Sequence, residues 1–381
     1  MSKYGNSDRD DPVPEERGSR FRLPVIAWLS VLFFAACTKM SPEDGVARHD
    51  GTLVRLTVSL PQPALPTKGA RAGGLSGDAE NRIEDVMILV LEQENGKYVY
   101  RYMTEGERLE STGNSAQFQA KLLSTTKPVK LMLAGNYGDA FAAYAPSPGR
   151  SEAEVKAGIG CSFTGAARSL PMYGEIAVPS GLEADRENRF SVKMLRAVAR
   201  IDVEKDLTAD SRSLRIESVR LYRPNDKIQL APDEFFASES PRVTVPSVFA
   251  GAVKSQSPVV TETSEPDPVS VAGIYVPEAD EVADAAARLT DATCIVVGGY
   301  YDGQSQPTYY RVDFDPGLEG HPFGQILRNH RYVFRIRKVT GPGWSDPGLA
   351  AVNKATSIVA EIEPWEDFTT EMHFEGDNYI G

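Results

Sequence analysis

The chain has 381 residues, of which 41% are hydrophobic, and it carries a formal net charge of −12. This hydrophobic fraction is enough to fill real cores, which excludes global disorder, and the length allows two domains of ordinary size. The acidic balance argues against a nucleic-acid backbone as partner and suits a soluble surface domain that repels copies of itself.

The first predicted element is an export signal that ends at a cysteine. Residues 23–36 form an apolar stretch, LPVIAWLSVLFFAA, with three arginines in front of it and Cys37 directly after it. A basic flank before a short apolar stretch is typical of a secretory signal, and a transmembrane helix would need roughly 20 apolar residues. The small residues Ala35 and Ala36 resemble a bacterial lipobox, in which the cysteine is acylated and becomes the first mature residue. We therefore expect lipidation at Cys37, with an uncleaved anchor or a plain secretory signal as the alternatives.

Residues 1–22 do not fit an ordinary signal sequence. They are polar and include five acidic residues, Asp8, Asp10, Asp11, Glu15 and Glu16. A start codon assigned too far upstream would explain them. We assign residues 1–36 to the signal segment and the polar residues 37–51 to a tether.

Short strands separated by turn residues are predicted after the tether. The first, Thr52 to Leu60, alternates apolar and polar residues, which is the period-two pattern of a half-buried strand. Three prolines end it, and a glycine-rich loop of the kind that proteases cut follows at 67–80. The first half also predicts one short helix, at 151–157. Its further strands are expected at 83–91, 97–102, 115–123, 129–134 and 176–178.

The second half continues in the same way. Residues 190–203 are predicted to form one long strand with a bulge near Leu195. Residues 292–301 and 308–314 are predicted to form a hairpin across Asp302-Gly303, whereas 223–275 are rich in Pro, Ser and Glu and predict mostly loop. Further strands are expected at 214–222, 332–339, 357–363 and 368–374.

Many strands at short spacing with few helix signals predict an all-β fold of β-sandwich architecture. The stretch 180–189 is charged and poor in apolar residues. We expect the boundary there, between an N-terminal β-sandwich domain at 52–187 and a C-terminal one at 188–381.

No local motif for catalysis or metal binding occurs in the sequence. There is no HExxH spacing, no GxSxG elbow, no P-loop and no GxGxxG, and the chain has four histidines, His49, His321, His330 and His373. Although a triad of distant residues needs no local motif, we expect no enzymatic activity, no metal and no cofactor. Cys161 and Cys294 could form one disulfide in an oxidising compartment, but two free thiols are favoured because the residues fall in different predicted domains.

Five stretches, in order along the chain, carry a resemblance to a known family. They are Ala70-Arg71-Ala72 before IEDVMILVL, VKLMLAGNYGD at 129–139, LPMYGE at 170–175, LRAVARIDV at 195–203, and LRNHRYVFRIRKVTGPG at 327–343 with Trp365 after it. Together they resemble the FimA-type fimbrillins, the type V pilins that some Gram-negative anaerobes export as lipoproteins. Each stretch also has a plain structural reading. The arginines of the fourth would face solvent, and in the fifth Asn329 would accept a left-handed turn while Arg328 reaches backbone carbonyls.

The resemblance implies a structural and adhesive subunit of a cell-surface fimbria. Two transthyretin-like β-sandwich domains would follow the lipidated N-terminus, which holds the precursor at the outer membrane. A surface protease would cut after Arg71 and release the strand Thr52 to Leu60. A strand from the C-terminal region of a neighbouring subunit would then fill the vacated groove by β-augmentation. Donor candidates are Phe368, Met372 and Phe374, and the groove would hold Val54, Leu56 and Val58, or their alternates Leu53 and Leu60.

The position in the fibre and the ligand stay open at this stage. Stalk, tip and anchor subunits are all compatible with the residues, and the short tail after Trp365 departs from the donor expected of a stalk. The implied partners are other fimbrial subunits, the outer membrane through the lipid, and a host or bacterial surface ligand. A second class of function is a surface lipoprotein that does not polymerise and binds glycan, for which the aromatic pairs Tyr300-Tyr301 and Tyr309-Tyr310 are candidates.

Overall fold

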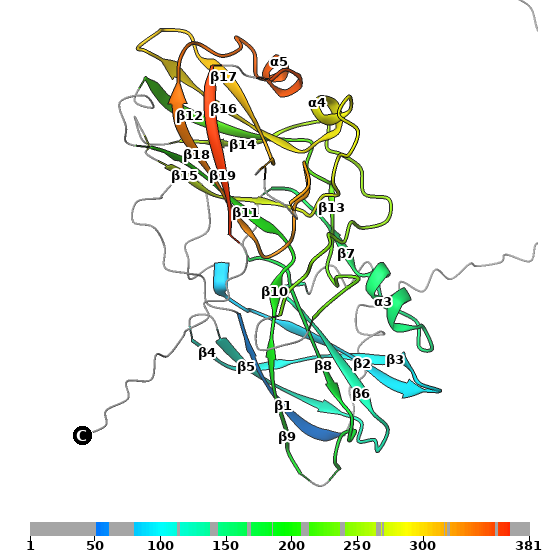
Figure 1. The fold of residues 1–381 in the computed structure, drawn as a ribbon. Coiled ribbons are helices and arrows are strands. Elements are labelled where there is room, and N and C mark those ends of the chain that lie inside the picture. The colour runs from blue at the N-terminus through cyan, green and yellow to red at the C-terminus, as the bar shows by residue number, and fades with distance from the viewer. Residues whose placement is uncertain are drawn as a thin grey trace, which may run out of the picture. The chain divides into compact units, whose positions relative to one another are not determined.

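The computed structural model describes residues 51–60, 80–112, 115–137, 144–165, 169–184, 186–206, 213–236, 241–263, 268, 270–315, 317, 321–354 and 357–365. All of them belong to one compact unit, Ser41–Gly381. Strands dominate these ranges and the helices are short (Figure 1). None of the helices in the described ranges is long and apolar enough to cross a membrane.

Two sheets enclose the first core. One contains, in spatial order, β4 (Glu107–Thr112), β5 (Ser115–Leu122), β1 (Thr52–Ser59) and β9 (Asn188–Lys193). The other contains β10 (Leu195–Arg196), β8 (Met172–Val178), β6 (Val129–Gly135), β2 (Val86–Glu94) and β3 (Lys97–Glu105). Apolar side chains from both sheets form one continuous core, as expected when two sheets pack face to face.

Two further sheets enclose the second core. One contains β15 (Ser270–Val276), β11 (Ala199–Lys205), β18 (Arg331–Val339) and β19 (Ile358–Trp365). The other contains β14 (Val259–Glu262), β12 (Leu214–Tyr222), β16 (Cys294–Tyr301) and β17 (Thr308–Asp313). The predicted fold class, all-β with two sandwiches in tandem, is confirmed.

Smaller elements join these sheets. The remaining elements are β7 (Gly160–Ser162), which pairs with β13 (Lys227–Gln229), and the helices α3 (Glu152–Gly158), α4 (Arg288–Asp291) and α5 (Pro347–Val352). The predicted hairpin between β16 and β17 is present. Its connection, residues 302–307, is longer than the two-residue turn that Asp302-Gly303 predicts, although Asp302 and Gly303 both have positive φ, 46° and 71°.

The pairing of β2 with β6 lies at the centre of the first core. Ile88 and Leu131, one on each strand, are both fully buried, as their apolar stretches predict. We expect Ile88→Ala and Leu131→Ala each to lower the free energy of unfolding by roughly 2 to 5 kcal/mol, because each leaves a cavity among packed side chains. Urea denaturation measures this loss. Leu123→Ala, at an exposed leucine, is the matched control and should change little.

The segment predicted as one long strand, 190–203, forms three strands instead. β9 pairs with β1, β10 pairs with β8, and β11 pairs with β15 and β18, so the chain passes through three different sheets. Apolar side chains before Ala199 pack in the first core, except Leu195, which packs with Val243 and Leu327, and those from Ala199 onward pack in the second. The residues from Met194 to Ala199 are all buried, so the break in alternation near Leu195, predicted as a bulge, is the place where the chain changes sheets.

The expected boundary at 187/188 falls inside the first sandwich. β9 begins at Asn188, and its side-chain amide donates to the carbonyl oxygen of Glu183 at 3.0 Å. Leu182, within the charged stretch, is buried. This stretch therefore makes the turn that leads into β9, and the second core starts at Ala199.

Five of the described strands were not predicted, namely β4, β7, β13, β14 and β15. Two of these, β4 and β15, were missed for opposite reasons. β4 is an edge strand whose side chains are all exposed, so it has no apolar alternation to detect. β15 is buried along its whole length, but it lies in a region whose overall composition predicts loop. Its Gly273 has a positive φ of 76° and its N–H donates to Asp202 Oδ1, where β11 and β15 shift register.

Candidate functional site

Strand β1 lies inside its sheet, between β5 and β9 (Figure 1). It pairs antiparallel with β5 along all eight of its residues and parallel with β9 over six of them. Both of its main-chain edges are therefore engaged. If β1 were removed, β5 and β9 would face each other as two unpaired edges separated by the width of one strand.

The inward face of β1 is apolar. Val54, Leu56 and Val58 have no exposed surface, whereas Leu53 is 36% exposed. Of the two alternates predicted for the groove, the structure therefore selects Val54, Leu56 and Val58, and Leu60 just beyond the strand is also buried. Burying a Val or Leu side chain contributes roughly 1.5 to 3 kcal/mol, so these residues are the main attachment of β1 to the core.

Hydrogen bonds fix both ends of β1. At the start, the hydroxyl of Thr52 donates to the carbonyl oxygen of Glu183 at 2.6 Å and accepts from the amide of Asn188 at 3.3 Å. At the end, the N–H of Met194 donates to the carbonyl oxygen of Ser59 at 2.8 Å. The register of β1 is thus determined independently of its outward side chains.

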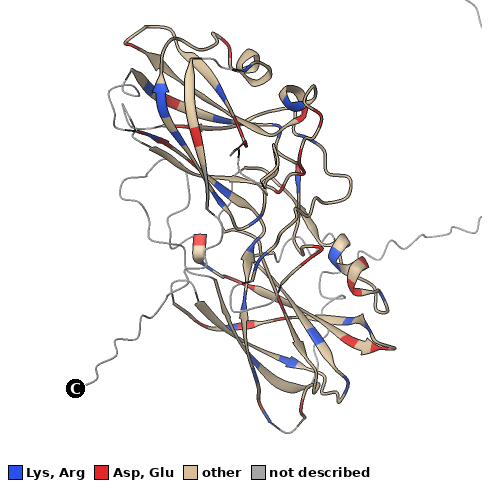
Figure 2. Cartoon of the chain, in the orientation of Figure 1, with Lys and Arg blue, Asp and Glu red and all other residues tan. Residues whose placement is uncertain are grey.

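The outward face of β1 carries one ion pair. Arg55 lies directly beside Arg189 of β9, and the carboxylate of Glu187 approaches both, with 2.8 Å to Arg55 Nε and 2.6 Å to Arg189 Nη2. The Arg55 side chain is one-third exposed, so the pair contributes at most about 1 kcal/mol. Basic and acidic residues are scattered over both sandwiches (Figure 2). Apolar packing therefore contributes more than this ion pair to the attachment of β1.

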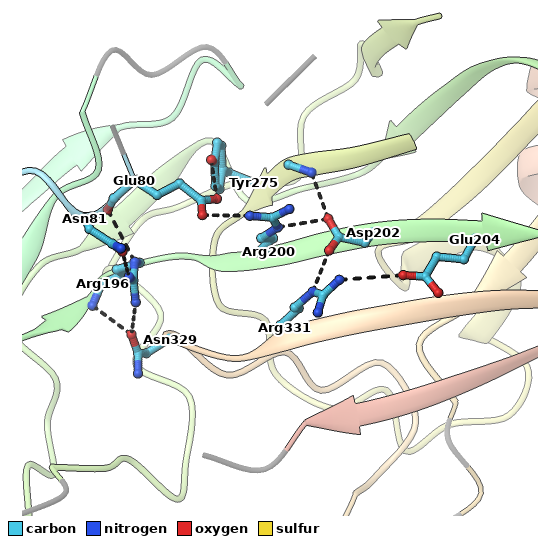
Figure 3. A network of polar contacts seen from close by, with 10 residues as sticks. Glu80, Asn81, Arg196, Arg200, Asp202, Glu204, Tyr275, Asn329 and Arg331 are labelled. Atoms are coloured by element: carbon cyan, nitrogen blue, oxygen red, sulfur yellow. Dashed lines mark hydrogen bonds and ion pairs between the residues drawn. The ribbon is translucent and has the colours of Figure 1, made fainter. Parts of the chain in front are cut away.

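Glu80 is held by side chains that are distant in the sequence (Figure 3). The Glu80 carboxylate is buried and accepts hydrogen bonds from Arg200 Nη1 at 2.7 Å and from the hydroxyl of Tyr275. Burial alone would lower the pKa of Arg200, but Asp202 and Glu80 outweigh it and raise the pKa above its ordinary value. Arg200 therefore stays charged and links Glu80 to the fully buried Asp202.

Arg196 binds the next residue of the same segment. Its guanidinium donates to the side-chain oxygen of Asn81, to the carbonyl oxygen of Glu80 and, at 3.1 Å, to Asn329 Oδ1 (Figure 3). Arg196 is buried, so the prediction that this arginine faces solvent is wrong. Burial lowers the pKa of Arg196. The buried cation is tolerated because oxygen acceptors surround it.

The turn at Arg328–His330 has the geometry expected from the sequence. Asn329 has a φ of 57°, in the left-handed region that Asn tolerates. Arg328 is fully buried and donates to the carbonyl oxygens of Gln229 and Leu230, and its guanidinium pairs with Glu278 at 2.6 Å. Both parts of the structural reading of this motif are therefore confirmed.

The predicted processing and donor residues cannot be placed. Cys37, Lys68, Arg71 and the donor candidates Phe368, Met372 and Phe374, with the predicted strand 368–374, lie outside the described residues. The structure thus describes β1 and its place between β5 and β9, whereas strand exchange, the lipidation, the cut and the donor stay predictions. The residues that sequence analysis missed are Glu80 and Asn81. Arg196 and Arg200 lie within an apolar stretch, so two cations are placed among buried residues. This was a usable signal that acceptor side chains such as Glu80 and Asn81 lie nearby.

The described residues offer no metal site, since they contain no cluster of three or more candidate ligands. Cys161 and Cys294 are free thiols. Burial raises the pKa of each to about 11, so neither is a thiolate at neutral pH.

The tyrosine pairs considered for glycan binding are already in contact with other side chains. Tyr310 is fully buried, as strand alternation predicts for one member of each pair. The rings of Tyr300 and Tyr309 are covered by Arg215 and Arg220, whose guanidinium carbons lie 4.3 and 5.1 Å from the ring centroids. These cation–π contacts occupy a face that a sugar ring would need for stacking.

No protein-family model matches the chain, and no curated protein matches its sequence. Among solved structures, a candidate cell adhesion protein from Parabacteroides distasonis is similar over 84% of this chain and 99% of its own, with a TM-score of 0.50 and 17% identity. A second candidate cell adhesion protein from that organism is similar over 82% and 98%, with a TM-score of 0.50 and 13% identity. The tip fimbrial protein Mfa3 from Porphyromonas gingivalis, truncated at its C-terminus, gives a TM-score of 0.45 at 16% identity over 82% and 100%. At these identities, the first two similarities establish the fold alone.

Proposed function

We propose that this chain is a fimbrial subunit of the FimA type, without enzymatic activity. It is exported as a lipoprotein on Cys37, matured by cleavage after Arg71, and assembled by exchange of β1 for a strand of a neighbouring subunit. The observation that carries the proposal is the position of β1, an inner strand whose two edges are both paired and whose inward face is wholly buried. The two candidate adhesion proteins that share the fold support a role at the cell surface.

The bonds that hold β1 are of a kind that another strand can replace. Main-chain pairing with β5 and β9 does not depend on sequence, and the inward face requires only apolar residues at every second position. The segment 368–374 offers Phe368, Met372 and Phe374 at even spacing, so all three lie on one face of an extended strand. Once the covalent link through Arg71 is cut, β1 is held without a covalent tie to the sandwich.

A reversible lock tests strand exchange directly. Thr57 and Gln117 are directly opposite each other on β1 and β5 and both project away from the core, so Thr57→Cys with Gln117→Cys places two thiols within disulfide range. We expect the oxidised variant, after trypsin treatment, to remain monomeric. The same sample reduced with dithiothreitol should form SDS-resistant ladders on unboiled gels.

The single variant Thr57→Cys is the matched control and should assemble under both conditions. Because the locked and unlocked samples are the same protein, a difference in folding between variants cannot produce the expected contrast. Ladders of equal intensity from oxidised and reduced samples would show that β1 need not leave, and would contradict the proposal.

Cys37→Ala is expected to abolish acylation, because the thiol is the group that takes the diacylglycerol. Incorporation of labelled fatty acid into the protein measures this, with Cys161→Ala as the control that should label normally. Equal labelling of Cys37→Ala and wild type would contradict the lipobox.

A further inference from the structure

Three basic residues near the start of the folded chain are candidate sites for a trypsin-like protease. Lys68 and Arg71 precede Glu80, and Arg82 follows it by two residues. The Arg82 side chain is 56% exposed, so a protease could bind it as readily as any other arginine. A cut after Arg82 would remove Glu80 and Asn81 from the mature subunit.

The main chain around Arg82 is held in place. The side-chain amide of Asn136 donates to the carbonyl oxygen of Arg82 at 2.8 Å, and Asn136 Oδ1 accepts from the N–H of Glu84 at 2.7 Å. Ile83, which follows the scissile bond, is buried. A protease binds several residues on both sides of the bond it cuts in extended form, so this segment must open locally before cleavage.

The residues before Arg82 are held just as firmly from another part of the chain. Glu80 is bound by Arg200 and Tyr275, and Asn81 by Arg196, as described above. Hydrogen bonds that involve a charged group are the stronger kind, and Glu80 and Arg196 are both buried. Together with Asn136, they form a clamp on residues 80–84.

We propose that this clamp determines which arginyl bond is cut during maturation, by protecting the Arg82–Ile83 bond and leaving the bond after Arg71 as the site. The inference rests on the maturation cut of the proposed function. Hydrolysis after Arg71 consumes one water, leaves a carboxylate on Arg71 and creates an α-amino group on Ala72. Glu80 then becomes the first clamped residue of the mature subunit, and it holds the chain in place when β1 leaves.

Two variants open the clamp from opposite sides. Glu80→Gln removes the charge that Arg200 and Tyr275 bind, and Asn136→Gly removes the amide while still allowing the φ of 56° at that position. We expect each to raise the rate of cleavage after Arg82 about tenfold or more, because cleavage follows the population of the locally open state. Limited trypsin digestion of the full chain, with mass spectrometry of the new N-termini, measures this rate. Wild type should yield a stable product that begins at Ala72.

Glu204→Gln is the matched control. Glu204 pairs with Arg331 and Arg335, whereas the partner of Glu80 is Arg200, so we expect cleavage after Arg82 to stay at the wild-type rate. New cuts confined to Arg82 support the clamp. Cuts that also spread through the strands, for example after Lys130 in β6, would show that these residues hold the whole fold rather than one bond, and would overturn the inference.

Cleavage of the wild type after Arg82 at the same rate as after Arg71 would also overturn the inference. These readouts need no polymerisation. If ladders fail to form while Arg82 stays protected, strand exchange is wrong and the clamp stands. If ladders form from wild-type subunits that begin at Ile83, the clamp is wrong and strand exchange stands.

Discussion

A chain that carries both Lys68→Ala and Arg71→Ala is expected to remain an uncleaved monomer under trypsin conditions that convert the wild type into SDS-resistant ladders. Without the cut, β1 stays covalently linked to its own sandwich at high effective concentration, and a donor strand cannot compete with it. The expected effect is a complete loss of ladders. Arg71→Ala alone should slow maturation and leave Lys68 as the bypass site.

The control for this experiment is Lys97→Ala, which removes an exposed basic residue at the start of β3. It should mature and assemble like wild type. Ladders from the doubly substituted chain would remove the strand-exchange mechanism and favour the surface lipoprotein that does not polymerise.

Deletion of residues 368–381 is expected to block polymerisation while leaving the maturation cut intact. The truncated chain keeps β1 and the groove between β5 and β9 but loses the predicted donor. After trypsin treatment it should yield a product that begins at Ala72 and runs as a monomer on unboiled gels.

A mixing experiment separates the two halves of the mechanism. The cleaved, truncated chain has an exchangeable β1 and no donor, whereas the uncleaved Lys68→Ala, Arg71→Ala chain has a donor and a β1 that cannot be exchanged. Their mixture should form a heterodimer and nothing larger. Ladders from the truncated chain alone would show that the donor lies elsewhere in the subunit.

The strands that could be predicted are those in which apolar and polar residues alternate. In these strands one face is buried, and the whole strand belongs to a single sheet. β1, β5 and the β16–β17 hairpin follow from this pattern together with a turn signal such as Asp302-Gly303. The pattern does not reveal which strand pairs with which. For that reason residues 190–203 were predicted as one strand, although they form strands of three different sheets.

The buried face of β1 could be predicted from the sequence in outline, since its inward residues are one of the two alternates that alternation allows. The clamp on residues 80–84 could not be predicted from the sequence. Glu80 meets Tyr275 across 195 positions of sequence, and Arg196 meets Asn329 across 133, so no local pattern places them together. Lipidation, the cut after Arg71 and the donor remain predictions.

The pairing of β1 gives the acceptor groove a direction. An incoming strand that runs as β1 does keeps the longer antiparallel ladder with β5 and the shorter parallel one with β9. A reversed strand would pair in parallel with β5, and parallel pairing is slightly less stable per residue. Every joint would then repeat the same orientation, so the filament would be polar, with an unfilled groove at one end and an unused donor at the other.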